Sequence, residues 1–223
     1  MNVLYEDNHL LAVEKPYGVP SQADETGDND MLSLCKAYIK EKYNKPGNVY
    51  LGLVHRLDRP TGGVMVFART SKAAARLAAQ MKSGEFEKTY LAVLTAAPPE
   101  REGTLVHWLV KDEAAHIARI ADEDTPGAKR AELFFETLGQ QDGLTLVRIR
   151  LITGRFHQIR AQMAAIGCPV YGDMKYGPRD VKAPLALYAY RVCLNHPTTG
   201  QRLCLTAIPD RYPFTLFNIS DEN

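Results

Sequence analysis

The chain has 223 residues, of which 45% are hydrophobic and 24% charged, and its formal net charge is +1. This composition is typical of a globular protein and excludes an intrinsically disordered chain, which combines low hydrophobicity with high net charge. No apolar run reaches the roughly 18 residues of a membrane span, and the N-terminus lacks a signal-peptide layout, so we expect a cytoplasmic protein with no membrane partner.

The first part of the chain predicts two strands, a loop and a helix. The strands lie at 3–6 and 9–14, and two prolines and a glycine make 16–22 a loop. Apolar residues then recur at helical spacing over 31–39, with Asp30 in the N-cap position.

The next segments predict two strands and a second helix. Strands at 49–54 and 63–69 flank a polar turn, and an alanine-rich helix spans 71–83 and ends at Gly84. Further strands are predicted at 88–95, 104–110, 116–121, 131–137 and 144–152.

The last part predicts a third helix and two strands. The helix spans 156–166, with Phe156 and Ile166 on its buried face, and strands follow at 185–194 and 202–207. Many strands and few helices, not in strict alternation, indicate an α+β fold with a mixed, largely antiparallel sheet. With no linker, we expect a single domain over 1–223.

The four cysteines are scattered and include no CxxC pair, which argues against a zinc site. We expect all of them to be buried free thiols: Cys35, Cys168, Cys193 and Cys204. GxGxxG and GxxxxGK[ST] motifs are also absent, so the sequence indicates neither a dinucleotide nor a P-loop nucleotide.

Basic residues are distributed unevenly. Lys and Arg outnumber Asp and Glu in 51–110 and in 151–223, and acidic residues predominate elsewhere. If the fold brings the two basic segments together, a positive face can form on a nearly neutral protein.

One polar cluster, His55-Arg56-Leu57-Asp58-Arg59-Pro60-Thr61-Gly62-Gly63, lies between two predicted strands, which is a common place for catalytic groups. In an extended segment Arg56 and Asp58 point the same way, and an arginine beside a carboxylate favours its ionised form. That form suits a nucleophile or base. From spacing alone, an ordinary surface turn with an ion pair explains the cluster equally well.

A second cluster, Thr153-Gly154-Arg155-Phe156-His157-Gln158-Ile159-Arg160, opens the third predicted helix. Arg155 lies at the helix start, where free backbone N–H groups favour anions, and Arg160 can reach from the helix edge. A solvated polar helix face is the alternative. Tyr90 in an apolar strand is either core filling or a platform for a base, and Lys175 lies in a glycine-bracketed loop.

Together these blocks resemble the RluA family of RNA pseudouridine synthases. HRLDRPTGG, EKTYLAV and TGRFHQIRAQMAAIGCPVYGDMKYG follow in the family's order, and the opening VLYEDNHLLAVEKPYGVPSQ also resembles its first block. The resemblance covers residues 3–207. It implies the α+β pseudouridine synthase fold with a central RNA-binding cleft, and an isomerase that needs neither cofactor nor metal.

The family breaks the N-glycosidic bond of a uridine in RNA, rotates the uracil and rejoins it through C5. By resemblance, Asp58 is the essential carboxylate and either attacks the ribose C1′ or removes a proton from C2′. Arg155 would pair with that carboxylate, and Tyr90 would stack on the uracil. Arg56 would replace the extruded nucleotide or hold the RNA backbone. His55, His157, Arg160 and Lys175 are candidates for RNA contacts or loop bracing.

This chain departs from the family at three points. Gly62 stands where the family usually has serine, and Gln162 where it often has histidine. The frequent N-terminal S4-type domain is absent, so we expect a minimal, monomeric catalytic domain that recognises ribosomal or transfer RNA by itself.

Two other functions fit parts of the pattern. A catalytically silent RNA-binding module could share the fold, although it would not need Asp58, Tyr90 and Arg155 together. A metal-dependent hydrolase could use His55, Asp58, His107 and His157, although these lack the close spacing of common metal motifs.

Overall fold

The computed structural model describes residues 1–178 and 183–220, and this part of the chain forms two compact units. The first unit comprises Met1–Lys88 and Ala189–Ile208, and the second comprises Thr89–Tyr188 and the C-terminal segment from Pro209. Each unit combines several strands with few helices, and most of its neighbouring strands pair antiparallel, so the predicted α+β class is confirmed.

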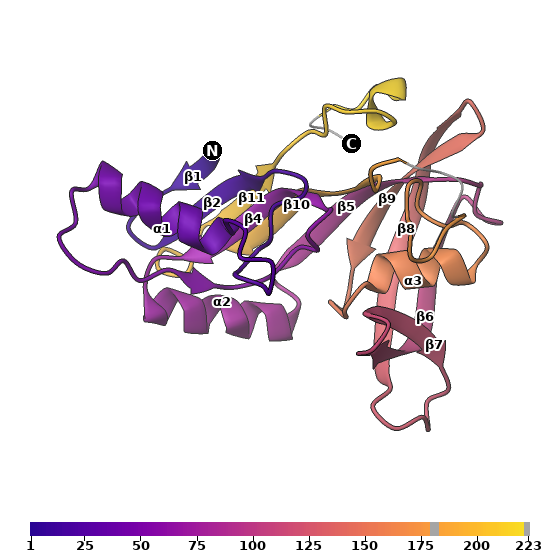
Figure 1. Cartoon of the computed structure of the whole chain (residues 1–223), viewed down its shortest axis with the longest axis horizontal. Coiled ribbons are helices and arrows are strands. Elements are labelled where there is room, and N and C mark those ends of the chain that lie inside the picture. Colours follow the sequence, from indigo (N-terminus) through magenta and orange to yellow (C-terminus); the bar gives the residue numbers. More distant parts are fainter. Residues whose placement is uncertain (179–182, 221–223) are drawn as a thin grey trace. The chain divides into compact units, whose positions relative to one another are not determined.

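The sheet of the first unit has strand order β1-β2-β4-β10, with β11 beside β10 (Figure 1), and β3 pairs with β4. The strands are β1 (Asn2–Glu6), β2 (Leu10–Lys15), β3 (Gly52–Leu53), β4 (Gly62–Ala68), β10 (Leu187–Asn195) and β11 (Arg202–Thr206). Every residue of β4 is buried, because β4 is a central strand and α2 packs against it. β3 is much shorter than the predicted strand at 49–54.

Helices α1 (Met31–Lys42) and α2 (Ser71–Ser83) belong to the same unit. The side chain of Asp30 accepts a hydrogen bond from the Ser33 amide, which confirms the predicted N-cap. Thr70 caps α2 in the same way, and Gly84 ends it in the left-handed conformation with φ 81°.

The sheet of the second unit has strand order β5-β9-β8-β6-β7. Its strands are β5 (Glu87–Leu94), β6 (Glu102–Asp112), β7 (Ile117–Ala121), β8 (Lys129–Gln141) and β9 (Leu144–Leu151). Helix α3 (Gln158–Ala165) packs against β6 and β7 (Figure 1), and a short 3-10 helix, Phe214–Leu216, lies near the C-terminus. Leu109, Ala118, Ala131 and Ala161 form a small core between strands and helix.

The third helix begins later than its apolar pattern predicts. His157 adopts a left-handed conformation with φ 50°, so α3 starts at Gln158 and Phe156 lies outside it. Phe156 is exposed and stacks on the His157 ring, which makes its prediction as a core residue wrong. The alternative interpretation, a solvated polar helix face, is wrong because Gln158, Arg160 and Gln162 are buried.

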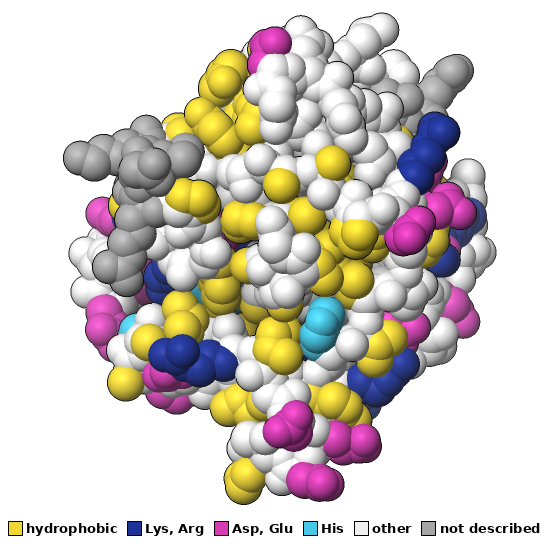
Figure 2. Space-filling view, turned by 90° about the vertical axis from the view of Figure 1, so that its right-hand side faces the viewer, with side chains coloured by type: hydrophobic (Ala, Val, Ile, Leu, Met, Phe, Trp, Pro, Cys, Tyr) yellow, Lys and Arg dark blue, Asp and Glu magenta, His cyan; other side chains and the backbone are white. Residues whose placement is uncertain are grey.

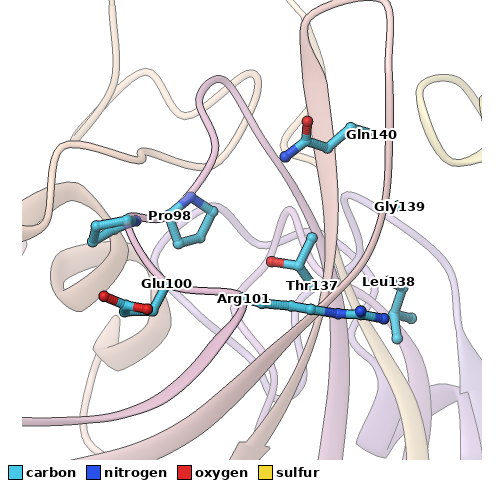
Figure 3. Close-up of a pocket in the computed structure, with 8 residues that line it drawn as sticks. Pro98, Glu100, Arg101, Thr137, Leu138, Gly139 and Gln140 are labelled. Carbon is cyan, nitrogen blue, oxygen red and sulfur yellow. The ribbon is translucent and has the colours of Figure 1, made fainter.

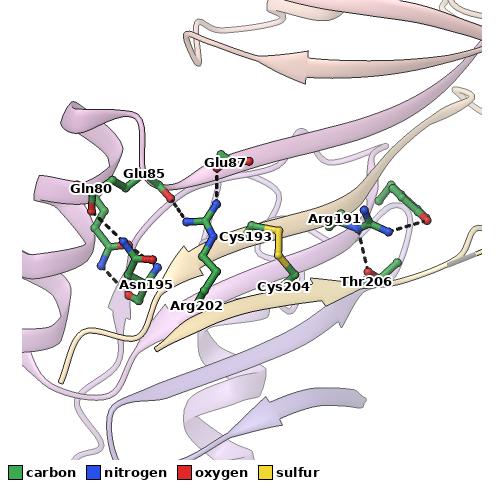
Figure 4. The surroundings of a disulfide bond; sticks show 10 residues. Gln80, Glu85, Glu87, Arg191, Cys193, Asn195, Arg202, Cys204 and Thr206 are labelled. Carbon is green, nitrogen blue, oxygen red and sulfur yellow. Dashed lines mark hydrogen bonds and ion pairs between the residues drawn. A yellow bond between two sulfur atoms is a disulfide. The ribbon is translucent and has the colours of Figure 1, made fainter. Parts of the chain in front are cut away.

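The cysteine prediction is wrong for two of the four residues. Cys193 and Cys204 lie opposite each other on β10 and β11 and form a disulfide (Figure 4). Their pairing depends on strand register, which a scattered spacing does not reveal. Cys35 and Cys168 are free and buried, as predicted.

None of the helices in the described part of the chain combines the length and apolar character needed to cross a membrane.

Candidate active site

Asp58 lies in a loop between β3 and β4 and is partly buried, while Arg56 beside it is exposed. The backbone around Asp58 is held from several directions. The Ser21 hydroxyl donates to the Leu57 carbonyl at 2.7 Å and accepts from the Leu57 amide at 3.0 Å. On the other side, the Arg59 carbonyl accepts from the Gly18 amide at 2.9 Å. The loop is therefore fixed on both sides of the carboxylate.

Lys15 at the end of β2 is a further anchor of this loop. Its side chain is completely buried, and Nζ donates to the carbonyls of Pro16 at 3.0 Å and Arg59 at 3.1 Å. Burial lowers the pKa of Lys15 to about 7, an effect that the Asp58 charge opposes and the Arg59 charge reinforces. A charge on this lysine therefore acts directly on Asp58.

Arg59 connects the Asp58 loop to the acidic segment before α1. Its Nε donates to the Gly18 carbonyl at 3.0 Å and one terminal nitrogen donates to Thr26 Oγ1 at 3.1 Å. The guanidinium also pairs with Asp28 and lies 3.6 Å from Asp24. These groups are exposed, so each pair contributes little alone, but together they hold the loop of residues 18–28 beside Asp58.

His55 faces inward in the same loop. Its Nε2 accepts from the Val66 amide at 3.0 Å, and its ring contacts Phe86. Burial, with a smaller effect of the Lys88 charge, lowers the pKa of His55 to about 3. The ring is therefore neutral at physiological pH and cannot act there as a cation for phosphate.

In the second unit, Tyr90 lies on β5 and its residue surface is 8% exposed. Arg155 precedes α3 and is exposed. Its Nε donates to the Arg130 carbonyl on β8 at 2.9 Å, and its backbone amide donates to Gln158 Oε1 at 2.9 Å. The Nε end of the Arg155 guanidinium is therefore fixed on β8, although the residue as a whole is exposed.

The loop of residues 172–177 contains Lys175 and is contacted by two further predicted site residues, Arg160 and His157. Arg160 forms two bonds with the Asp173 carboxylate, at 2.7 and 2.8 Å, and both side chains are buried. Asp173 also accepts from the amides of Lys175 and Tyr176. One carboxylate thus shapes the loop and neutralises the buried guanidinium.

His157 and Lys175 extend this network to β7. Arg160 donates to His157 Nε2 at 3.0 Å, so the neutral ring carries its proton on Nδ1 and donates to Tyr176 Oη at 2.9 Å. The Tyr176 oxygen also accepts from the Ala118 amide of β7, and Lys175 Nζ donates to the His116 carbonyl. Burial and the Arg160 charge lower the pKa of His157 to about 3. For His157 this arrangement favours loop bracing over phosphate contact.

Sequence reasoning missed Lys15 and Ser21, and it did not predict that Asp173 pairs with Arg160. A lysine that ends the apolar strand Leu10–Lys15 was the available signal for Lys15, because such a charge is buried only for a reason. Ser21 carried no local signal, since its partner Leu57 lies 36 residues away.

Figure 3 shows a pocket in the second unit. It has a volume of about 360 Å³ and is lined by residues 98–101, before β6, and 137–140 of β8. None of the predicted site residues lines it.

One face of the molecule carries hydrophobic side chains across its middle, with Lys and Arg in separate patches (Figure 2). A broad basic field is therefore not visible on that face.

The hydrolase alternative finds no support in the arrangement of its residues. Within residues 1–178 and 183–220, no three His, Cys, Asp or Glu side chains gather in a way that could hold a metal ion. His107 contacts Gln162, and His55 and His157 have the partners described above.

Comparison with known proteins gives a consistent result. Residues 9–165 match the family model described as RNA pseudouridylate synthase. The chain is 33% identical over 207 residues to the dual-specificity RNA pseudouridine synthase RluA of Yersinia pestis, covering 90% of this chain and 95% of that protein. It is 31% identical over 210 residues to the uncharacterized RNA pseudouridine synthase YhcT of Bacillus subtilis, covering 93% and 68%.

Solved structures share the fold. Human RNA Pseudouridylate Synthase Domain Containing 4 superposes with a TM-score of 0.80 at 22% identity, covering 95% of this chain and 89% of that one. Human RNA Pseudouridylate Synthase Domain Containing 1 gives a TM-score of 0.73 at 25% identity, covering 97% and 86%.

Proposed function

Since this chain belongs to the RNA pseudouridylate synthase family, we propose that it isomerises specific uridines to pseudouridine in ribosomal or transfer RNA, with Asp58 as the essential carboxylate. The two bacterial relatives named above are both called RNA pseudouridine synthases, and one of them is called dual-specificity. The observation that carries the assignment to Asp58 is its place in a loop whose backbone is fixed on both sides by Ser21, Gly18 and Lys15.

The chemistry asks little of the protein beyond a positioned carboxylate. Breaking the glycosidic bond develops positive charge on the ribose, and a carboxylate held near C1′ stabilises that charge. Asp58 either attacks C1′ or removes the proton from C2′. In both routes the uracil gains a proton at N1 and loses one from C5, so no electrons are exchanged with an outside partner. We therefore propose that no cofactor or metal takes part.

Three further residues complete the proposed machinery. Tyr90 offers a largely buried aromatic ring on a strand, which suits stacking on a uracil taken out of its helix. Arg155 is exposed and its Nε is held by the Arg130 carbonyl, which suits the guanidinium for pairing with a carboxylate. Arg56 is exposed beside Asp58, where it can hold the RNA backbone or replace the extruded nucleotide.

The remaining candidates have supporting roles in this proposal. His55 holds the Asp58 loop against β4, and His157 and Arg160 brace the loop of residues 172–177. Lys175 is exposed and is the member of that group best placed to meet an RNA phosphate. We further propose a monomeric cytoplasmic enzyme whose residues 1–223 form one catalytic domain with a central RNA-binding cleft.

Pseudouridine mapping tests the proposal. Unmodified ribosomal and transfer RNA pools are treated with wild type, Asp58→Asn or Asp112→Asn, and carbodiimide-labelled pseudouridines are then located by primer extension. Asp112 is a surface carboxylate paired with Arg119, so its variant is the matched control. We expect new stops with wild type and Asp112→Asn and none with Asp58→Asn. Stops made by Asp58→Asn would overturn the role of Asp58, and no stops with wild type would favour the silent RNA-binding module.

A further inference from the structure

Ser21 is buried, and its hydroxyl bonds to the backbone of one residue of the Asp58 loop, Leu57. Its surface is 6% exposed, and its hydroxyl both donates to the Leu57 carbonyl and accepts from the Leu57 amide. Residues 54–58 belong to no strand or helix, so no regular ladder is available to the Leu57 backbone. A single side chain therefore satisfies both polar groups of Leu57, which would be costly to bury unpaired.

Leu57 directly precedes Asp58, and its side chain is also buried. The backbone that follows Asp58 has its own anchors, since the Arg59 carbonyl accepts from Lys15 Nζ and the Gly18 amide. The Asp58 carbonyl itself accepts from the Thr61 amide at 2.9 Å. These anchors act after Cα of Asp58, whereas Ser21 acts before it. Without Ser21, the carboxylate could pivot about the remaining anchors.

We propose that Ser21 is a positioning residue for the reaction, which holds the Leu57 peptide so that the Asp58 carboxylate meets the ribose in a fixed orientation. The inference rests on the proposed function of Asp58. Its physical basis is that a reacting group must be held close to its productive geometry, and a displacement of about 1 Å can cost about 100-fold in rate. Ser21 itself touches neither the RNA nor the carboxylate in this role.

Two variants of Ser21 probe the hydroxyl at almost constant volume. Ser21→Ala removes both hydrogen bonds, and Ser21→Cys keeps a weaker donor and acceptor in the same place. Thr70→Ala is the matched control, because it also removes one hydroxyl that accepts from a backbone amide in the same unit, but at the start of α2. A purely structural role for Ser21 would make its variants behave like this control.

The experiment measures three quantities for each protein: the single-turnover rate at saturating RNA, the dissociation constant for that RNA, and the hydrogen exchange of the Leu57 amide. For Ser21→Ala we expect a rate lower by about 10- to 100-fold, an unchanged dissociation constant and faster exchange of the Leu57 amide. Ser21→Cys should lie between wild type and Ser21→Ala. Thr70→Ala should lose stability but keep the wild-type rate and the wild-type exchange at Leu57.

Several outcomes would overturn the inference. Unchanged exchange at Leu57 in Ser21→Ala would show that the hydroxyl does not hold this peptide, whatever the activity. Faster exchange with a wild-type rate would show that the hold does not matter for chemistry. A rate loss matched by Thr70→Ala would reduce Ser21 to general stability. Failure of the proposed function would show separately, as inactive wild type or as active Asp58→Asn.

Discussion

Asp173→Asn is expected to destabilise the protein strongly, because it leaves the Arg160 guanidinium buried without its counter-charge. The side chains of Arg160 and Asp173 are 6% and 0% exposed, and two charge-assisted hydrogen bonds of 2.7 and 2.8 Å join them. Breaking a buried pair by removing one charge typically costs about 3–5 kcal/mol. We expect a loss of this size in the free energy of unfolding, measured by urea denaturation.

Asp112→Asn makes the same chemical change in an exposed pair. Asp112 and Arg119 have side chains that are 28% and 61% exposed, so solvent screens the pair and the expected loss is much smaller than for Asp173→Asn. Removing the orphaned charge as well, in Arg160→Met/Asp173→Asn, should recover part of the loss seen in Asp173→Asn. Equal losses in the two Asp→Asn variants, or a double variant no more stable than Asp173→Asn, would refute this reasoning.

Two further changes test the Asp58 loop and the strand that follows it. Gly63→Ala should lower the free energy of unfolding by more than about 4 kcal/mol. The reason is that φ of Gly63 is 114° and an added Cβ would lie 2.2 Å from the Ala189 carbonyl oxygen. Gly200→Ala, at φ 74° with no described atom within 4 Å, should cost only about 1–2 kcal/mol, and denaturation curves that rank the two equally would contradict this. Burial lowers the pKa of Lys15 to about 7 in the folded protein, against an ordinary value of 10.5. Between pH 7 and pH 10.5 the unfolded chain therefore binds more protons than the folded protein. The contribution of Lys15 to the free energy of unfolding consequently rises with pH in this window. The difference in unfolding free energy between wild type and Lys15→Met should therefore increase by about 1.4 kcal/mol per pH unit in that window, and a difference that does not change with pH would argue against a buried, weakly basic lysine.

The sequence predicted the elements that local chemistry determines. The caps at Asp30 and Gly84 mark the ends of two helices because a side-chain acceptor and a left-handed glycine act within a few residues. The strands were likewise predicted from a local signal, the alternation of apolar and polar residues along the chain. The start of α3 was predicted too early, because Phe156 continues the apolar period although His157 leaves the helical conformation.

Features that depend on distant partners were not predictable from local pattern. The bond between Ser21 and Leu57 spans 36 residues, and the disulfide between Cys193 and Cys204 depends on the register of β10 and β11. From sequence, an arginine that binds RNA cannot be told from one that pairs with a buried carboxylate, because both carry the same charge. The contact of Arg160 with Asp173 in the structure identifies the second role. The roles of Asp58, Tyr90 and Arg155 came from resemblance and remain predictions.

The most direct test of the central claim follows the proton that leaves C5 of the target uridine. RNA labelled with tritium at C5 of uridine is incubated with purified wild type or Asp58→Asn, and the label released to water is counted. An isomerase that depends on Asp58 releases tritium in proportion to the pseudouridine formed, and Asp58→Asn releases none. Release by Asp58→Asn at the wild-type rate would contradict the assignment of the reaction to this carboxylate.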